Sequence, residues 1–504
     1  MTALGAGPVP QPDLPLGPAA ELLGLSWEVH ADPYAIGLHT LVRLAVRDNE
    51  RRAQLVVSRV LAKHIPVEPS VVRGAGVLLA GRVAGLLGAV VPVGIDRAWL
   101  EPPRSAAVRR GAAGLGRDGL VGGFGVDALV LGYCETATGL GHGVADALGA
   151  ADYLHTTRRS VPGMEPVAGF DEEHSHAVEH HLLPDDIGLL RGCRPLVLVD
   201  DELTTGTTSL NTIAALQARW PRERYVLATL TDLRSPAARE AFDERAAALG
   251  ARVDVAALVD ATLTTPDDVL DRARVARDVL RALPRASTPD ATARVVSLPP
   301  TWPAGVPLGG RHGFRPTDRE AHAQAVAAVA VELSALLPAG PVLVVGTEEL
   351  MHAPVLLADQ LARMHPGRVL VQSTTRSPVL VADANGYAVR HVVVAPAPDG
   401  PARMTRLHNV VDPDSQLRDT ELRDTQLSNA NLPGSVLRTG AVPPPYASIV
   451  LVTDTPSAAA APLAAELSRW AAESVVVVPM LESVLESVLG PVLGPVLEPV
   501  LDSA

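Results

Sequence analysis

The chain has 504 residues, which is more than one compact core can organise, so two or three domains are expected. Hydrophobic residues make up 47% of it and charged residues 20%, a balance that excludes a chain disordered throughout. Lys and Arg number 43 against 56 Asp and Glu, for a net charge of -13, which disfavours partners such as nucleic acid or an anionic membrane. Small phosphorylated ligands remain as anionic partners.

Cysteine and lysine are rare. Cys134 and Cys193 have neither the number for a disulfide framework nor the spacing of a zinc site, and the N-terminus lacks the features of a signal peptide, so a cytoplasmic protein is expected. Lys63 is the only lysine, which excludes chemistry that needs a lysine elsewhere. Arg73 and Arg82 interrupt the most apolar stretch, residues 71–95, which predicts a soluble helix and a buried strand instead of a membrane span.

Residues 1–26 are rich in Pro and Gly and are predicted to be a flexible leader. Residues 27–285 alternate between short β-branched runs and Ala- and Leu-rich helical stretches. This alternation is typical of an α/β domain whose largely parallel sheet is flanked by helices. Strands are predicted at residues 128–131, 153–156, 195–199, 226–230 and 253–259, and helices at residues 207–219 and 236–249.

Residues 286–310, rich in Pro, Gly and Ser, predict a linker to a second α/β domain, Rossmann-like, over residues 311–480. Its strands are predicted at residues 341–345, 369–372, 391–394, 449–452 and 474–478, and its helices at residues 353–364 and 459–472. Residues 416–432 repeat at a five-residue step and the low-complexity tail, residues 481–504, at a four-residue step. We interpret both as weakly structured segments, with an interaction arm as the alternative.

The most informative segment is RPLVLVDDELTTGTTSLNTIAAL, residues 194–216, in which a buried strand leads through two acids and a small-residue loop into a helix. Amides at a helix N-terminus attract an anion, and Gly206 lets the backbone approach it closely. The carboxylates of Asp200 and Asp201 can accept hydrogen bonds from two ribose hydroxyls. The pattern predicts a ribose 5-phosphate site that includes Thr204, Thr205, Thr207 and Thr208.

An ordinary helix cap is the alternative, but a cap needs only one threonine. A nucleotide P-loop is excluded because G-x-x-x-x-G-K-[ST] is absent. The string VLVDDELTTGTT resembles the diphosphate-sugar motif of type I phosphoribosyltransferases, such as the orotate enzymes. The resemblance implies that fold, phosphoribosyl pyrophosphate as substrate, and Mg²⁺ held by the pyrophosphate near Asp200 and Asp201.

The resemblance also assigns roles to two upstream segments. In the family, the loop after the preceding strand holds the pyrophosphate, and a simple Gly-rich turn is the alternative for this loop. A mobile loop after the next strand supplies cations to the departing pyrophosphate, a role that fits Arg158 and Arg159, although the orotate enzymes have a lysine there. His174 and His176 are expected to contact the ligand, with a metal pair or a solvated surface as alternatives. The pyrophosphate-binding residues implied are Gly132, Glu135, Thr136 and Thr138.

The second domain has two polar loops, each directly after a predicted strand. Ligands of parallel sheets collect where strands end, so both loops are predicted to share one crevice. The string TTRSP resembles the TRSP domain, which follows phosphoribosyltransferase domains in bacterial proteins associated with tellurite and stress-resistance operons. A turn-capping role is the alternative for Arg376. The predicted site residues are Gly346, Thr347, Glu348, Glu349, Thr374, Thr375, Arg376, Ser377 and Pro378, joined by Arg311, His312 and Gly313.

The predicted function is Mg²⁺-dependent transfer of phosphoribosyl from phosphoribosyl pyrophosphate to a nucleobase-like acceptor, in the synthesis of a nucleoside-like metabolite. Two alternatives stay open. The first domain is a non-catalytic sensor of phosphoribosyl pyrophosphate or a nucleotide, with the TRSP-like domain as its output, or the reaction runs in reverse. Nucleic acid and membrane are not expected as partners, and a homodimer is left open beside a monomer.

Overall fold

The computed structural model describes residues 16–101, 123–161, 163–171, 179–283, 288–300, 302–411 and 444–481. His174 and His176, the repeats at residues 416–432 and residues 482–504 of the tail lie outside these described residues. Within the described residues, no helix combines the length and the apolar composition needed to cross a membrane.

The first domain is built on a 6-stranded sheet of order β1-β10-β9-β8-β4-β5, in which only β1 pairs antiparallel. Leu196 to Val199 of β8 are fully buried, as expected for a central strand covered on both faces. Its strands are β1 Ser26–Ala31, β4 Leu129–Gly132, β5 Asp152–His155, β8 Leu196–Leu203, β9 Arg224–Asp232 and β10 Arg252–Thr264. Its helices are α1 Pro18–Leu23, α2 Leu38–Leu41, α3 Pro69–Leu86, α5 Ala137–Leu148, α6 Thr207–Gln217, α7 Pro236–Ala248 and α8 Val269–Arg281.

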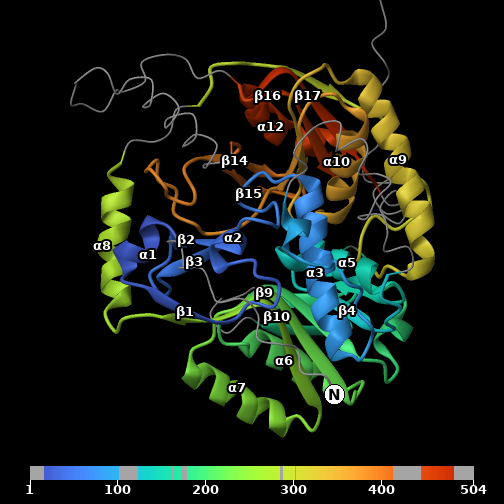
Figure 1. The fold of residues 1–504 in the computed structure, drawn as a ribbon. Coiled ribbons are helices and arrows are strands. Elements are labelled where there is room, and N and C mark those ends of the chain that lie inside the picture. Colours follow the sequence, from blue (N-terminus) through green and yellow to red (C-terminus); the bar gives the residue numbers. More distant parts are fainter. Residues whose placement is uncertain are drawn as a thin grey trace, which may run out of the picture.

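The second domain has a fully parallel 5-stranded sheet of order β11-β17-β16-β12-β13. It lies above the first sheet in Figure 1, with the hairpin β14-β15 beside it. The strands are β11 Arg294–Ser297, β12 Val342–Gly346, β13 Val369–Ser373, β14 Val392–Ala397, β15 Gly400–His408, β16 Tyr446–Thr453 and β17 Ala471–Pro479. The helices are α9 Arg319–Leu336, α10 His352–Met364 and α12 Ser457–Leu467.

Two hairpins and four 3-10 turns complete the described structure. The hairpins pair β2 with β3 and β6 with β7, both antiparallel. Their bounds are β2 Val42–Val46, β3 Gln54–Ser58, β6 Ala168–Asp171 and β7 Glu179–Leu182, and those of the turns are Arg97–Leu100, Ile187–Leu190, Pro316–Asp318 and Ser468–Trp470.

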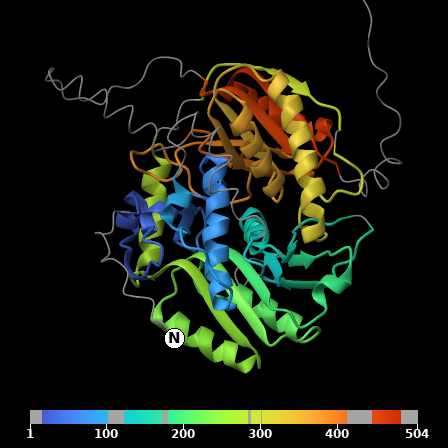
Figure 2. The same cartoon turned by 45° about the vertical axis from the view of Figure 1, so that its right-hand side comes forward.

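The two domains exchange backbone pairs at their sheet edges. Val67, from the first domain, forms two hydrogen bonds with Val371 of β13, at 3.0 and 2.8 Å. Phe314, at the start of the second domain, forms two with Tyr153 of β5, both at 2.8 Å. Each pairing satisfies amides and carbonyls of an edge strand, and one hydrophobic core runs through both domains. The domains therefore form one packed unit (Figure 2).

The sequence predictions for three segments differ from the structure. The predicted leader contributes Leu16 and α1 to the core, where their apolar side chains are buried and α1 packs against α8 and β2. The predicted linker contributes β11, whose four residues pair with the edge of the second sheet. The strand expected before Ile95 is absent from the described structure, where α3 is followed by a loop with Val90 and Val93 exposed.

Candidate functional site

The segment after β8 has the local geometry that its sequence predicts. Asp200 and Asp201 lie half-buried at the end of the strand, and the Asp201 amide donates to Asp200 Oδ1 at 2.9 Å. Gly206 has a φ of 79°, and α6 begins at the next residue. A Cβ at this position would lie 2.6 Å from the Phe242 ring, so glycine is needed for both conformation and space. The acids and the threonine loop thus lie together at the carboxyl edge of the first sheet.

Three consecutive carboxylates crowd this strand end. Burial and the neighbouring Asp201 raise the pKa of Asp200 well above its ordinary value. Burial and Asp201 likewise raise the pKa of Glu202 to about 7, against the opposing effect of Arg52. A bound cation, or hydroxyl groups that donate hydrogen bonds, would reduce the repulsion between these carboxylates. Glu202 is a third member of this acidic group that the sequence analysis missed.

The loop between β4 and α5 lies beside this acidic group. Thr138 Oγ1 donates to the Glu135 carbonyl at 2.9 Å, and a Cβ at Gly132 would meet Tyr153 Oη at 2.5 Å. Lys63 donates a hydrogen bond from Nζ to Thr136 Oγ1. Lys63 was not predicted as a site residue, although the fact that it is the only lysine in the sequence could have pointed to it.

Arg158 and Arg159 follow β5 and lie against the second domain. The Arg158 amide donates to Glu349 Oε1 at 3.0 Å. Arg159 donates from Nη1 to Asp454 Oδ2 at 2.7 Å, and its Nε lies 2.8 Å from Asp399 Oδ2. Arg159 is 11% exposed and paired with two acids of the second domain, and its role in binding the departing pyrophosphate stays a prediction.

The two polar loops of the second domain contact each other, while the crevice predicted between them stays a prediction. The Glu348 amide donates to Thr374 Oγ1 at 3.1 Å, and Ser373 Oγ donates to the Glu348 carbonyl at the same distance. Arg403 donates to both Glu348 oxygens, at 2.5 and 3.0 Å. Thr347 directly follows β12 and is buried.

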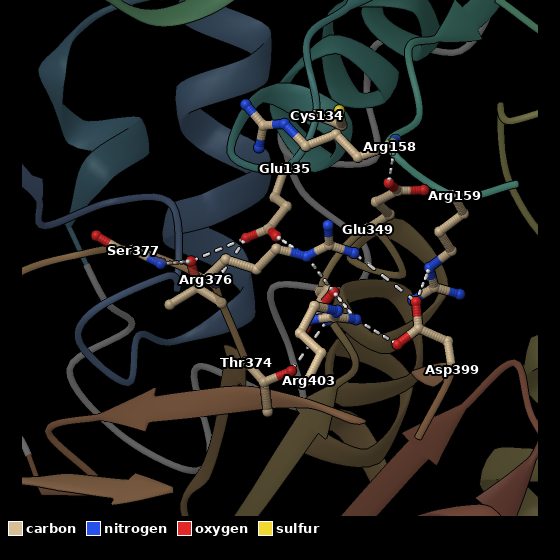
Figure 3. A network of polar contacts seen from close by, with 12 residues as sticks. Cys134, Glu135, Arg158, Arg159, Glu349, Thr374, Arg376, Ser377, Asp399 and Arg403 are labelled. Carbon is tan, nitrogen blue, oxygen red and sulfur yellow. Dashed lines mark hydrogen bonds and ion pairs between the residues drawn. The ribbon is translucent and has the colours of Figure 1, made fainter. Parts of the chain in front are cut away.

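These two loops of the second domain face the β4–α5 loop of the first (Figure 3). Thr375 Oγ1 and the Arg376 amide donate to Glu135 Oε2 at 2.9 and 3.0 Å. Arg376 Nε forms ion pairs with Glu135 Oε1 at 3.1 Å and with Glu348 Oε2 at 3.0 Å. The carboxyl ends of the two sheets therefore meet in one acid–arginine network, formed by Glu135, Arg159, Arg311, Glu348, Glu349, Arg376, Asp399, Arg403 and Asp454.

Comparison with known families assigns both domains. Residues 41–262 match a phosphoribosyl transferase family, and residues 308–467 match the TRSP domain that lies C-terminal to that transferase domain. The chain is a phosphoribosyl transferase domain joined to a TRSP domain. None of the curated proteins matches the sequence.

Solved adenine phosphoribosyltransferases superpose on part of the chain. The Trypanosoma brucei enzyme is 18% identical over 27% of this chain and 56% of its own, with a TM-score of 0.22, so the chain spans just over half of that relative. The Rhodothermus marinus enzyme is 18% identical over 27% and 69%, with a TM-score of 0.20. The Giardia lamblia enzyme is 20% identical over 30% and 77%, with a TM-score of 0.20. The assignment of the two domains therefore rests on the family matches.

Between the transferase and TRSP domains lies a small pocket. It lies where the strand order of the TRSP sheet reverses, between the loops after β12 and β16, the usual ligand position in open α/β sheets. Arg311 crosses it to Glu349 at 3.3 Å and Asp454 at 2.9 Å. The opposite wall comes from the transferase domain and includes Thr138, His142 and His155.

The residues beside Arg311 lie elsewhere. His312 is hydrogen-bonded through Nδ1 to the Leu183 carbonyl at 2.8 Å. Gly313 has a φ of 111° and packs against Leu189. Of the three residues assigned to the site before the first helix of the second domain, the structure therefore brings only Arg311 into it.

His142, Asp146 and His352 lie close enough together to hold a metal ion, with one ligand atom of each within 4.8 Å of the others. The two imidazole rings are stacked, however, with centroids 3.5 Å apart and an interplanar angle of 10°. Stacked rings cannot both direct a nitrogen at one ion without turning. Arg319 already pairs with Asp146 at 3.1 Å. The three residues form part of the interface between the two domains, with His142 and Asp146 on α5 and His352 on α10.

Proposed function

We propose that the chain transfers phosphoribosyl from phosphoribosyl pyrophosphate to a nucleobase-like acceptor, as a step in the synthesis of a nucleoside-like metabolite. The observation that carries the proposal is the segment from Asp200 to Thr208. It presents hydroxyl acceptors, a glycine turn and a helix N-terminus in the order that ribose 5-phosphate requires. The family of the first domain supports this choice of substrate class.

Each part of the proposed substrate has a matching group. The 5′-phosphate binds the threonine loop before α6, where amides and hydroxyls donate and the helix dipole favours negative charge. Asp200 and Asp201 accept hydrogen bonds from the ribose hydroxyls. The pyrophosphate lies against the β4–α5 loop, near the Lys63 ammonium.

The acidic group at the end of β8 fits the Mg²⁺ that this chemistry implies. Mg²⁺ prefers oxygen ligands and is commonly held by one or two carboxylates together with substrate phosphates. Burial and the neighbouring Asp201 raise the pKa of Glu202 to about 7, and a divalent cation bound there would offset the repulsion between the two carboxylates. When bound, the ion would neutralise charge on the pyrophosphate.

The proposed reaction is a substitution at C1 of the ribose. A nitrogen lone pair of the acceptor forms the new C1–N bond, and the C1–O bond breaks with its electron pair leaving on pyrophosphate. The acceptor nitrogen releases one proton. The protein contributes placement and charge stabilisation and needs no nucleophile of its own.

The direct test supplies the full-length chain with phosphoribosyl pyrophosphate and a panel of nucleobase-like acceptors and measures pyrophosphate release, with products identified by mass spectrometry. Release with at least one acceptor, lost in an Asp200→Asn, Asp201→Asn double variant, supports the proposal. Binding of phosphoribosyl pyrophosphate without release across the panel would favour a sensor, for which the network between the two domains is a route of coupling. Adding pyrophosphate to nucleotides tests the reverse direction.

The proposed setting is the cytoplasm, because Cys134 and Cys193 are both free and a reducing compartment keeps them so. The proposed partners are the two small-molecule substrates. We also propose that two copies of the chain form a homodimer, and the mass of the native protein in solution tests this.

A further inference from the structure

The β4–α5 loop lacks a basic residue, since residues 132–138 read GYCETAT. Pyrophosphate carries several negative charges, and its binding in proteins depends on cations and amide donors. The cations of this loop must therefore come from other segments. Lys63 is one, through its hydrogen bond to Thr136. Arg158 of the transferase domain also lies near Glu135 (Figure 3), and a further cation comes from the TRSP domain.

Arg376 is held beside this loop from two sides. Its amide and Thr375 Oγ1 both donate to Glu135 Oε2, which fixes the backbone of the TTRSP loop against the β4–α5 loop. Its Nε lies between Glu135 and Glu348, at 3.1 and 3.0 Å. These contacts use the Nε edge of the guanidinium and so set the direction of its terminal amino groups (Figure 3).

The terminal amino groups of Arg376 are less committed than those of the neighbouring arginines. Nη2 has one long ion pair, 3.8 Å to Asp399, and the side chain is 26% exposed. Arg159 and Arg311 are 11% and 14% exposed and both pair with Asp454. Both terminal amino groups of Arg403 donate hydrogen bonds to the Glu348 carboxylate. Arg376 is therefore the arginine of the network best placed to receive an anion.

We infer that Arg376 of the TRSP domain binds the pyrophosphate moiety of phosphoribosyl pyrophosphate, so that the TRSP domain completes the substrate site of the transferase domain. This inference rests on the proposed function. Glu135 and Glu348 orient the guanidinium, and its terminal amino groups donate to pyrophosphate oxygens. The TRSP domain thereby supplies the positive charge that the transferase loop does not contain.

The experiment is calorimetry on the full-length chain with three ligands: phosphoribosyl pyrophosphate, inorganic pyrophosphate and ribose 5-phosphate. Arg376→Gln is expected to weaken the first two by roughly tenfold or more, because a charge-assisted contact is lost, and to leave ribose 5-phosphate unchanged. Arg376→Lys keeps the charge and is expected to recover part of the pyrophosphate affinity. Arg390→Gln is the matched control, since Arg390 pairs with Asp383 in the same domain.

The outcomes separate the two proposals. Unchanged pyrophosphate affinity in Arg376→Gln, or equal weakening of all three ligands, overturns the role of Arg376 and leaves the proposed function standing. An Arg376→Lys variant that melts like the parent chain yet binds pyrophosphate no better than Arg376→Gln also overturns it. A parent chain that binds neither phosphoribosyl pyrophosphate nor ribose 5-phosphate overturns the proposed function, and the inference falls with it.

Discussion

Arg159 of the transferase domain and Asp454 of the TRSP domain form a buried ion pair, with Nη1 2.7 Å from Oδ2 and side chains 11% and 4% exposed. Arg311 donates to the same oxygen at 2.9 Å. These two arginines hold the pKa of Asp454 well below its ordinary range, although burial alone would raise it. The pair fixes the carboxyl ends of the two sheets against each other.

Replacing Asp454 by Asn should destabilise the fold strongly, because two buried guanidinium groups would lose their shared carboxylate. Breaking a buried pair in this way costs about 3–5 kcal/mol, which urea unfolding would measure. Asp271→Asn is the control, since Asp271 and Arg274 are 71% and 70% exposed. An exposed pair contributes less than about 1 kcal/mol. Equal effects of the two changes would contradict the structural role of Asp454.

Gly206→Ala should cost more stability than Gly250→Ala. Both glycines have positive φ, 79° and 67°, so alanine strains the backbone at each by roughly 1–2 kcal/mol. Only at Gly206 would the new Cβ meet a neighbour, the Phe242 ring at 2.6 Å. Thermal melting of the two variants measures the difference. A Gly206 variant as stable as the Gly250 variant would show that the loop before α6 is not held as described.

The stability of the chain should fall between pH 5 and pH 8 in part because of Glu202. Burial and Asp201 raise its pKa to about 7, from about 4.3 in an unfolded chain. The folded state then binds the proton more tightly, so this group lowers stability as pH rises through that window. Glu202→Gln should gain stability relative to the parent at pH 8 but not at pH 5. A difference from the parent that is the same at both pH values, as measured by urea unfolding, would contradict this assignment; exposed Glu240→Gln is the control.

Protection of Lys63 from chemical modification can report on ligand binding at the site, because Lys63 is the only lysine. An amine-reactive reagent can modify just this side chain and the terminal amine. Phosphoribosyl pyrophosphate should slow modification of Lys63 and leave the terminal amine unaffected, as read by peptide mass spectrometry. Ribose 5-phosphate, which lacks the pyrophosphate, should protect less. Equal labelling with and without phosphoribosyl pyrophosphate would separate Lys63 from the substrate site.

Local patterns predicted the structure best. The run LVLV, the acid pair and the T-T-G-T-T loop follow one another within thirteen residues, so the sequence alone predicts β8 and the start of α6. The strand end was wrong, because β8 continues past the predicted end at residue 199 to Leu203. Four of the five parallel strands of the second sheet, β12, β13, β16 and β17, also follow from apolar runs, whereas the segment predicted at residues 391–394 forms part of an antiparallel hairpin. The four-residue β11 is too short for its pattern to stand out from a Pro-rich stretch.

Contacts between the domains could not be predicted in this way. Glu135 and Arg376 are 241 residues apart, and nothing in either loop specifies the other as a partner. Asp399 and Arg403 lie in or beside a hairpin without a sequence motif. Asp454 was easier to predict as a site residue. It lies just after the strand predicted at residues 449–452, and ligands of parallel sheets collect where strands end. The direction of Arg159 depends on these same contacts, so it could not be predicted from the sequence alone.

The central claim is that Asp200 and Asp201 bind the ribose of phosphoribosyl pyrophosphate, and calorimetry on the Asp200→Asn, Asp201→Asn double variant tests it most directly. Removing two negative charges should favour an anionic ligand on electrostatic grounds alone. We nevertheless predict loss of binding with an unchanged fold, because each carboxylate that would accept from a ribose hydroxyl is replaced by a neutral amide with a single, weaker acceptor oxygen. Binding in an Asp271→Asn control should be unchanged. Retained or tighter binding in the double variant would contradict the account.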